Sequence, residues 1–140
     1  MRNAERKNIK MQYPQLPEAE LSVMQVIWEQ KTPVSGVHIT SLLLSVKNWK
    51  TQTVFTLLSR LVKKGFLSSE KQGKERYYQT LVNRDDYLNQ ETGRFIEIFH
   101  KSSITGLMNA IVSSTDISEN ELSELSQWLD KKKKEDKSNV

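Results

Sequence analysis

The most constraining feature of the sequence is a change of hydrophobic period at Gly65. Before it, apolar residues at i, i+3, i+4 and i+7 predict a helix from about residue 51 to 64, which Gly65 can end in a left-handed conformation. The apolar stripe consists of Val54, Leu57, Leu58 and Leu61. After it, residues 66–70 and 76–80 are short strand-forming runs joined by a basic, glycine-containing segment, a pattern that predicts a β-hairpin.

Two further helices are predicted upstream of this point. The first begins near Pro17, because proline suits the first turn of a helix and acidic residues follow it. The second begins after Ser35, a suitable N-cap, and its expected apolar positions are Val37, Ile39, Leu42, Leu43 and Val46. Three short helices and a hairpin give a mainly α fold with a small β-hairpin wing, the element order of a winged helix-turn-helix domain. We expect that domain at residues 14–82, after a flexible arm at residues 1–13.

The rest of the chain carries three helix-start signals. Asn83 can cap a long helix, and Ser102 or Ser103 can begin the next one. Ser118 and Glu121 have the spacing of a capping box at the start of a last helix. We therefore expect the part after the wing to be helical.

Apolar stripes on these later helices are too extensive for so short a segment to enclose by itself. Pairing with a second copy would bury them and would give a twofold-symmetric molecule. We expect a helical dimerisation domain at residues 83–130, followed by a basic flexible tail at residues 131–140. The residues expected in the dimer interface are Phe95, Phe99, Ile104, Leu107, Met108, Ile111, Leu122, Leu125, Trp128 and Leu129.

Charge is unevenly distributed along the chain. Residues 1–16 carry +3, residues 17–83 carry +4, residues 84–130 carry −6 and residues 131–140 carry +3. Between Lys47 and Arg76, eight basic residues accompany only Glu70 and Glu75. Such asymmetry is typical of a chain in which one part meets a polyanion, although lysine and glutamate also coat ordinary solvated helices.

The polar side of the 51–64 helix contains no acid and carries amide, hydroxyl and guanidinium groups. A helix in the DNA major groove needs side chains that reach base edges and others that hold phosphates. The base-edge candidates are Lys50, Gln52, Thr53 and Thr56. The phosphate candidates are Thr51, Arg60, Lys63 and Lys64, with Lys71, Lys74 and Arg76 on the wing. An ordinary polar helix face with a solvated hairpin is the alternative reading of the same residues.

Three segments resemble a known family. They are LPEAELSVMQVIWEQ, WKTQTVFTLLSRLVKKGFL and GKERYYQTLV, and the similarity extends over about residues 14–130. The chain is similar to the penicillinase and methicillin-resistance repressors (BlaI/MecI type). The resemblance implies a homodimer that binds a palindromic operator and represses β-lactam-resistance genes. It also implies release of repression by a membrane-bound sensor protease and cleavage in the C-terminal part.

The sequence departs from the family pattern in three places. The copper-responsive relatives carry a cysteine-rich motif, and this chain has no cysteine, so that mode of copper sensing is excluded. The β-lactam-responsive relatives are often cleaved at an Asn–Phe bond, whereas the matching bond here is Ala110–Ile111, next to Asn109. Thr51 stands where proline often begins the recognition helix.

Several other chemistries find no support. The lack of cysteine excludes disulfides, thiolate metal sites and cysteine nucleophiles. His38 and His100 have no partners at ligand spacing, and Asp85–Asp86 is explained by favourable charge at a helix start. We therefore predict no cofactor, no metal and no enzymatic activity. No apolar run is long enough to span a membrane and no signal peptide is recognisable, which favours the cytoplasm.

Two alternative functions remain open from the sequence. Winged helices also serve as protein-interaction modules, which would not need an acid-free helix face together with a basic wing. A repressor could also be released by a small ligand bound among the helices, but no residue pattern identifies a pocket for one.

Overall fold

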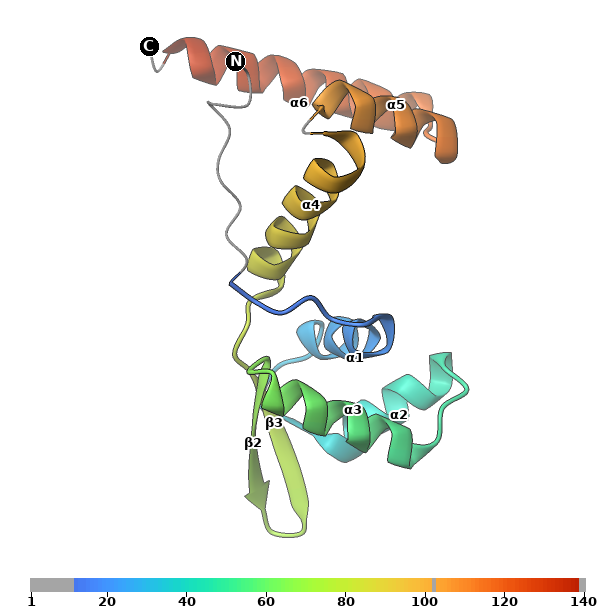
Figure 1. The fold of residues 1–140 in the computed structure, drawn as a ribbon, viewed down its shortest axis with the longest axis vertical. Coiled ribbons are helices and arrows are strands. Elements are labelled where there is room, and N and C mark those ends of the chain that lie inside the picture. Colours follow the sequence, from blue (N-terminus) through green and yellow to red (C-terminus); the bar gives the residue numbers. More distant parts are fainter. Residues whose placement is uncertain (1–11, 102, 139–140) are drawn as a thin grey trace. The chain divides into compact units, whose positions relative to one another are not determined.

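The computed structural model describes residues 12–101 and 103–138 (Figure 1). The chain divides into two compact units, Met1–Arg94 and Phe95–Val140, called here the head and the tail. In chain order the elements are α1 (Glu18–Trp28), β1 (Val34–Ser35), α2 (Gly36–Val46), α3 (Thr51–Lys63), β2 (Leu67–Gln72), β3 (Glu75–Thr80), α4 (Arg84–His100), α5 (Ile104–Ser114) and α6 (Glu119–Ser138). Helix α4 begins in the head and continues into the tail.

The transition from helix α3 to the sheet follows from two hydrogen bonds around Gly65. Its φ is 82°, a left-handed value that glycine adopts without strain. The N–H of Gly65 donates to the carbonyl of Val62 at 3.1 Å, and the N–H of Phe66 donates to that of Leu61 at 3.0 Å. This pair of bonds is a Schellman motif, which satisfies the last helix carbonyls and turns the chain into β2. The predicted helix end is confirmed.

The head contains a three-stranded antiparallel sheet in the order β1-β3-β2. Strands β2 and β3 form the predicted hairpin, but they are longer than expected and pair as far as Gln72 and Glu75. The turn is only Gly73–Lys74, and Gly73 has a φ of 66°, as a two-residue hairpin turn requires at its first position. β1 was not predicted, because its two residues become a strand only by pairing with β3, at Val34↔Tyr78 and Ser35↔Tyr77.

The helices and the sheet of the head enclose one hydrophobic core. Its buried members are Leu16, Val23, Met24, Ile27, Val34, Ile39, Leu43, Val54, Leu57, Leu58, Leu61, Phe66, Leu67, Tyr78, Val82 and Tyr87. The whole predicted stripe of α3 belongs to this set. Two positions predicted for the apolar face of α2 are wrong, because Val37 and Val46 are 59% and 69% exposed. The buried face of α2 instead includes Gly36 and Thr40.

Gly36 sets the distance between α2 and α3. A Cβ atom at this position would lie 2.7 Å from Cε1 of Phe55 on α3, closer than carbon atoms can approach. Ser35 caps α2 as predicted, because its side chain accepts a hydrogen bond from the N–H of His38 at 3.1 Å. The start of α2 is therefore fixed both by its cap and by close packing.

The first turns of α4 belong to the head rather than to the tail. Oε1 of Gln90 accepts hydrogen bonds from the backbone N–H groups of Gln12 and Tyr13, and its Nε2 donates to the carbonyl of Tyr13. The hydroxyl of Tyr87 accepts a bond from the N–H of Leu16 at 2.8 Å. The compact units thus divide after Arg94, whereas the sequence suggested a boundary at residues 82–83. Residues 1–11 of the expected arm lie outside the described residues.

The tail consists of the end of α4 with α5 and α6. Ser103 caps α5 by accepting from the N–H of Gly106 at 3.0 Å, whereas the alternative, Ser102, lies outside the described residues. Ser118 and Glu121 form the predicted capping box of α6. Residues 131–138, expected as a flexible tail, continue α6, since lysine is a good helix former and favours the negative helix end.

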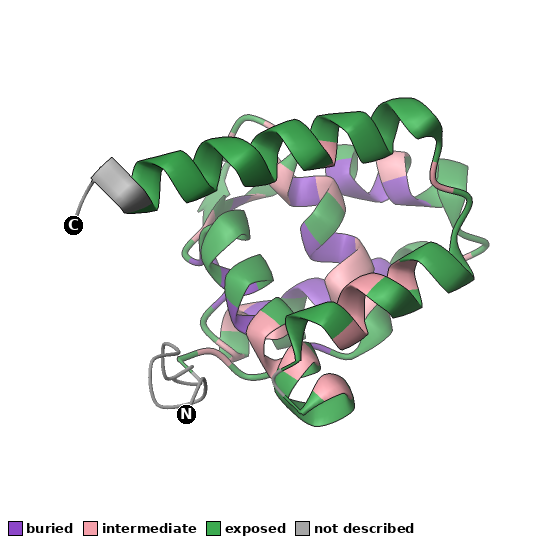
Figure 2. Cartoon of the chain, turned by 90° about the horizontal axis from the view of Figure 1, so that it is seen from above, coloured by how far each residue is buried: buried purple, intermediate pink, exposed green. Residues whose placement is uncertain are grey.

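No residue of the tail is buried within the parts whose exposure is described, residues 95–101 and 103–136. Figure 2 shows the same contrast, with buried residues absent from the long C-terminal helix. Within residues 12–101 and 103–138, no helix is both long enough and apolar enough to cross a membrane.

Candidate nucleic-acid interface

Helix α3 presents a continuous polar face to solvent. The exposed candidates along it are Lys50, Thr51, Gln52, Thr53, Thr56, Arg60 and Lys63. Their placement follows from the helix period, because the buried stripe fixes α3 on the core and turns the intervening positions outward. The structure therefore agrees with the prediction that these polar residues share one exposed side of the helix.

A shallow depression of about 310 Å³ gathers all four base-edge candidates. It is bordered by Lys50, Gln52, Thr53, Thr56, Leu57 and Arg60. The hydroxyl of Thr56 donates to the backbone carbonyl of Gln52 at 3.0 Å, which leaves its methyl group and oxygen lone pairs available. Arg60 thus lies beside the amide and hydroxyl groups rather than apart from them.

A second recess, of about 350 Å³, lies between the end of α3 and the wing. Its border includes Lys63 from the helix and Arg76 from β3, so the fold brings together cations from two different elements. Nη1 of Arg76 donates to Oγ of Ser69 at 3.0 Å, which holds the guanidinium across the hairpin. Burial raises the pKa of Tyr78 on the same border, and the charge of Arg76 partly offsets this effect. Two cations beside hydroxyl groups suit an anion such as a phosphate.

The wing carries the remaining predicted cations on exposed positions. Lys71 is the cross-strand partner of Arg76, and Lys74 lies in the turn. Among residues 12–101 and 103–138, no acidic side chain forms an ion pair with Lys50, Arg60 or Lys63, or with the two wing lysines. Within this part of the chain these charges have no ion-pair partner, which leaves them available to a polyanion.

Lys64 differs from the other predicted phosphate candidates. Its Nζ forms an ion pair with Oε1 of Glu20, a residue of α1 that is only 3% exposed. The contact joins α1 to the end of α3 and compensates a buried carboxylate. Sequence reasoning could not separate Lys64 from Lys63, because the distinction depends on a partner 44 residues away.

Two polar residues at this surface were not predicted. Ser59 lies on the exposed side of α3, three residues after Thr56, and borders the second recess together with Ser69. The helical spacing would have found Ser59. Ser69 could be found only from the strand register, which places it opposite Tyr78.

The turn between α2 and α3 is partly anchored. Trp49 is half-buried and packs against the core, and Nζ of Lys47 lies 5.9 Å from the centre of its ring. This packing anchors the turn directly before Lys50 and Gln52.

The predicted interface residues of the tail are accessible in the single chain. Those classed as exposed are Phe95, Phe99, Ile104, Leu122, Trp128 and Leu129, while Leu107, Met108, Ile111 and Leu125 are half-buried. The rings of Phe95 and Phe99 lie 4.9 Å apart. Of the predicted cleavage residues, Asn109 and Ala110 are exposed and Ile111 is half-buried, all within α5.

Metal binding has no support in the described part of the chain. No group of three or more His, Asp or Glu side chains is positioned to hold an ion among residues 12–101 and 103–138.

The fold and the exposed basic face together define a winged helix-turn-helix protein.

The chain is similar over most of its length to repressors of one family. Residues 16–131 match the family of penicillinase repressors. The penicillinase repressor of Bacillus licheniformis is 29% identical over 120 residues, which cover 86% of this chain and 93% of that protein. The methicillin resistance regulatory protein MecI of Staphylococcus aureus (strain N315) is 33% identical over 118 residues, covering 84% of this chain and 95% of that protein. A solution structure of the DNA-binding domain of the repressor BlaI is 34% identical with a TM-score of 0.49, over 59% of this chain and 94% of that chain.

The chain therefore belongs to the penicillinase repressor family. The predicted family resemblance is confirmed, and a family of repressors agrees with the prediction that the chain is not an enzyme.

Proposed function

We propose that this protein represses transcription as a homodimer that binds a palindromic operator in the cytoplasm, and that it controls β-lactam-resistance genes. The observation that carries the proposal is the acid-free exposed face of α3, whose cations have no ion-pair partner among residues 12–101 and 103–138. The names of its relatives, a penicillinase repressor and a methicillin resistance regulator, support the choice of regulated genes.

Base reading is assigned to Lys50, Gln52, Thr53 and Thr56. Gln52 is exposed in the first turn of α3, the part of a recognition helix that meets base edges. Its amide can pair with adenine through one donor and one acceptor, and the methyl groups of Thr53 and Thr56 suit thymine.

Phosphate binding is assigned to the cations around this centre. Lys63 and Arg76 share the recess between α3 and the wing, and Lys71 and Lys74 extend the positive charge along the hairpin. Arg60 can reach either a phosphate or a base edge from its place in the depression. Lys64 is left out of this set because its ammonium compensates Glu20.

Dimerisation is assigned to the tail. Eight of its large apolar residues are 43–67% exposed in the single chain, and none of residues 95–101 and 103–136 is buried. A second copy of the same helices would cover these side chains without any other partner. Two linked heads would then read the two halves of a palindrome.

DNA binding is tested by footprinting the region upstream of the protein's own gene and then measuring affinity against salt. A phosphate-dominated interface should lose affinity steeply as salt rises, because bound counterions are released. Lys63→Gln should weaken binding to all sequences alike and flatten the slope of the salt dependence by about one. An affinity that is insensitive to salt would instead support a protein-interaction module.

Base reading is tested with Gln52→Ala against all single-base variants of the operator. The preference at one position should relax by about 1–3 kcal/mol if the amide makes two hydrogen bonds to a base. Asn89→Ala, which removes an exposed amide from α4, is the matched control and should leave the profile unchanged. An unchanged profile for Gln52→Ala contradicts the assignment.

The dimer is tested by comparing the full chain with a chain that ends at Arg94. The shorter chain should be monomeric and should bind the operator about 100-fold more weakly, because the second head no longer benefits from its high effective concentration. Sedimentation that finds the full chain monomeric at micromolar concentration would refute the dimer.

Induction is proposed to proceed through cleavage by a membrane sensor protease within Asn109–Ile111. These residues lie in the middle of α5, so a protease needs local unwinding before it can bind them in an extended form. In the proposed dimer Leu107 and Ile111 of α5 belong to the interface, so a cut here would divide its apolar stripe and separate the two heads. Intact mass measured after cells meet a β-lactam should show fragments that divide between Leu107 and Val112. Derepression with the chain still whole would point to a ligand or a partner instead.

A further inference from the structure

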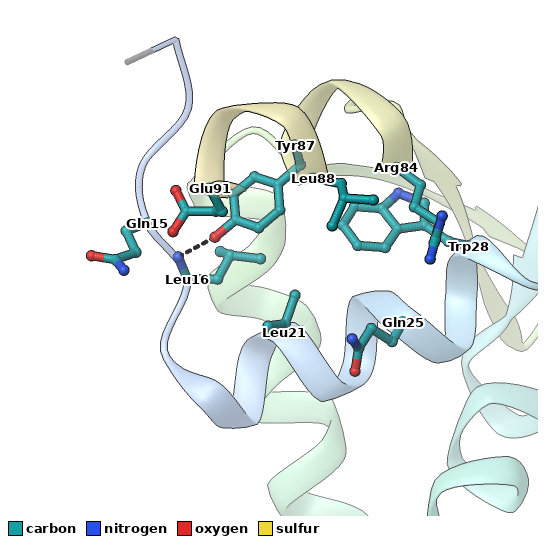
Figure 3. Close-up of a pocket in the computed structure, with 9 residues that line it drawn as sticks. All are labelled: Gln15, Leu16, Leu21, Gln25, Trp28, Arg84, Tyr87, Leu88 and Glu91. Atoms are coloured by element: carbon teal, nitrogen blue, oxygen red, sulfur yellow. Dashed lines mark hydrogen bonds between the residues drawn. The ribbon is translucent and has the colours of Figure 1, made fainter. Parts of the chain in front are cut away.

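We propose that the head contains a binding site for a small aromatic carboxylate, separate from the face of α3. A cavity of about 210 Å³ lies between α1, the first turns of α4 and the segment that precedes α1 (Figure 3). All of its lining residues belong to the head. The proposal does not depend on DNA binding and can be tested without an operator.

The walls of the cavity are apolar. Leu16, Leu21 and Leu88 line it, and the polar atoms of its aromatic residues are already bonded elsewhere. Nε1 of Trp28 donates to the carbonyl of Val82 at 2.9 Å, and the hydroxyl of Tyr87 accepts from the N–H of Leu16 at 2.8 Å. The rings therefore offer carbon surfaces to a ligand, while their donors and acceptors fix them in place.

The edge of the cavity carries one guanidinium. Arg84 lies beside Trp28 in Figure 3, and its ion pair with Asp85 has an N–O distance of 3.5 Å between side chains that are 59% and 79% exposed. Such an exposed contact stabilises little and is readily exchanged. A carboxylate at the edge of the cavity would receive a forked pair of hydrogen bonds from the guanidinium instead.

Glu91 restricts the charge of the ligand. Its carboxylate lies beside Tyr87 in Figure 3, with Leu88 on the same helix between it and Arg84. It would repel a second negative group, so the site favours a ligand with one carboxylate. The side-chain amides of Gln15 and Gln25 also line the cavity, and they can lie beside either the ring or the carboxylate of such a molecule.

The volume limits the size of the ligand. A dry cavity of about 150 Å³ holds benzene, so 210 Å³ accommodates one ring with a short carboxyl-bearing arm. Such a molecule has about ten heavy atoms, and we expect a dissociation constant on the order of 1 mM for an unoptimised example. The ligand would contact α4, the helix that continues from the head into the tail.

Phenylacetate is the probe, and phenylacetamide and phenethylamine are its neutral and cationic counterparts. Binding to the full chain is followed by the indole N–H resonances, assigned with Trp49→Phe and Trp128→Phe. Phenylacetate should shift the Trp28 resonance saturably and leave that of Trp49 in place, with the two counterparts at least about fivefold weaker. No saturable shift up to about 20 mM, well above the expected dissociation constant, would overturn the site. Equal or tighter binding of either counterpart would overturn the carboxylate.

Two variants locate the ligand. Arg84→Gln should weaken phenylacetate about fivefold and leave phenylacetamide unchanged, whereas Arg60→Gln, on α3 and outside the cavity lining, should change neither. Leu88→Trp should fill the cavity and abolish the binding of phenylacetate and phenylacetamide. Leu44→Trp on α2 is the matched control and should leave their binding unchanged, since Leu88 and Leu44 are similarly exposed, at 48% and 41%. Binding that survives Leu88→Trp, or that is indifferent to Arg84→Gln, refutes the proposal.

Discussion

The head and the tail are built from equally clear helix signals, yet they differ in what those helices enclose. Within residues 12–94 the head buries sixteen hydrophobic residues, and ten of these are less than 2% exposed. The tail, over residues 95–101 and 103–136, buries none. Both regions have capped helices with apolar stripes, so local pattern does not reveal which region has a core of its own.

The difference follows from the packing partners that each region offers. In the head, three helices and a sheet meet from several directions, so one apolar stripe such as that of α3 is covered on all sides. In the tail, Phe99 and Trp128 remain 67% and 53% exposed. Isolated helices of this length are marginal in water, and most of their stability must come from packing. The proposed second copy supplies that packing.

The strongest test of this comparison separates the two regions. A chain of residues 1–94 should unfold cooperatively at a temperature independent of its concentration. A peptide of residues 95–140 should lose most of its helical circular dichroism on dilution, because dilution removes the partner that covers its apolar residues. A tail peptide that unfolds cooperatively with no dependence on concentration would show that it has a core of its own.

Replacing one leucine in each region should have different effects on the stability of the head. Leu58 is fully buried in the head, so Leu58→Ala should lower the free energy of unfolding by about 2–5 kcal/mol, measured with urea. Leu129→Ala in the tail should leave the unfolding of the head unchanged and instead raise the dissociation constant of the dimer. Similar losses of head stability for both variants would contradict the comparison.

The ion pair between Glu20 and Lys64 should contribute less to the stability of the head than a buried leucine does. Glu20→Gln should lower the free energy of unfolding of the head by about 1 kcal/mol, because Lys64 loses its carboxylate partner while an amide still fills the site. Glu18→Gln, at an exposed position two residues earlier, is the matched control and should change stability by less than about 0.5 kcal/mol. Equal effects of the two substitutions would show that the buried pair contributes nothing specific.

The smallest expected effect is a decline of head stability in alkaline solution. Burial raises the pKa of Tyr87 above its ordinary value of 10.0; the bond from Leu16 and the charge of Arg94 oppose this, and the charge of Glu91 adds to it. Above pH 10 the unfolded chain therefore loses this proton before the folded chain does, so stability falls as the pH rises. Tyr87→Phe should flatten the decline measured by urea unfolding between neutral and alkaline pH. An unchanged slope would show that Tyr87 does not contribute to it.

The sequence predicted those parts of the fold that are decided by near neighbours. The apolar stripe of α3, its end at Gly65 and the capping box at Ser118 depend on residues within two turns of a helix. The exposed face of α3 follows from the same stripe, so the placement of Gln52 and Arg60 at the candidate site was also predictable.

The missed features depend on residues far apart in the chain. Strand β1 exists because Val34 pairs with Tyr78, and Val37 is exposed because close packing at Gly36 determines which side of α2 is buried. Lys64 differs from Lys63 because its ammonium group forms an ion pair with Glu20 on another helix. The cavity beside Trp28 likewise arises from three separate segments, which no local pattern brings together.

The amide of Gln90 has a further consequence for the connectivity of the head. By bonding both the N–H and the C=O of Tyr13, 77 residues away, it holds the segment before α1 against the helix that ends the head. The two ends of the head therefore meet, and the chain of the head forms a nearly closed ring. A circularly permuted head, joined by a short linker from the residues after Arg94 to Gln12, should keep its core. The wing turn at Gly73, where a Cβ atom would meet nothing within 4 Å, offers an exposed place for the new ends.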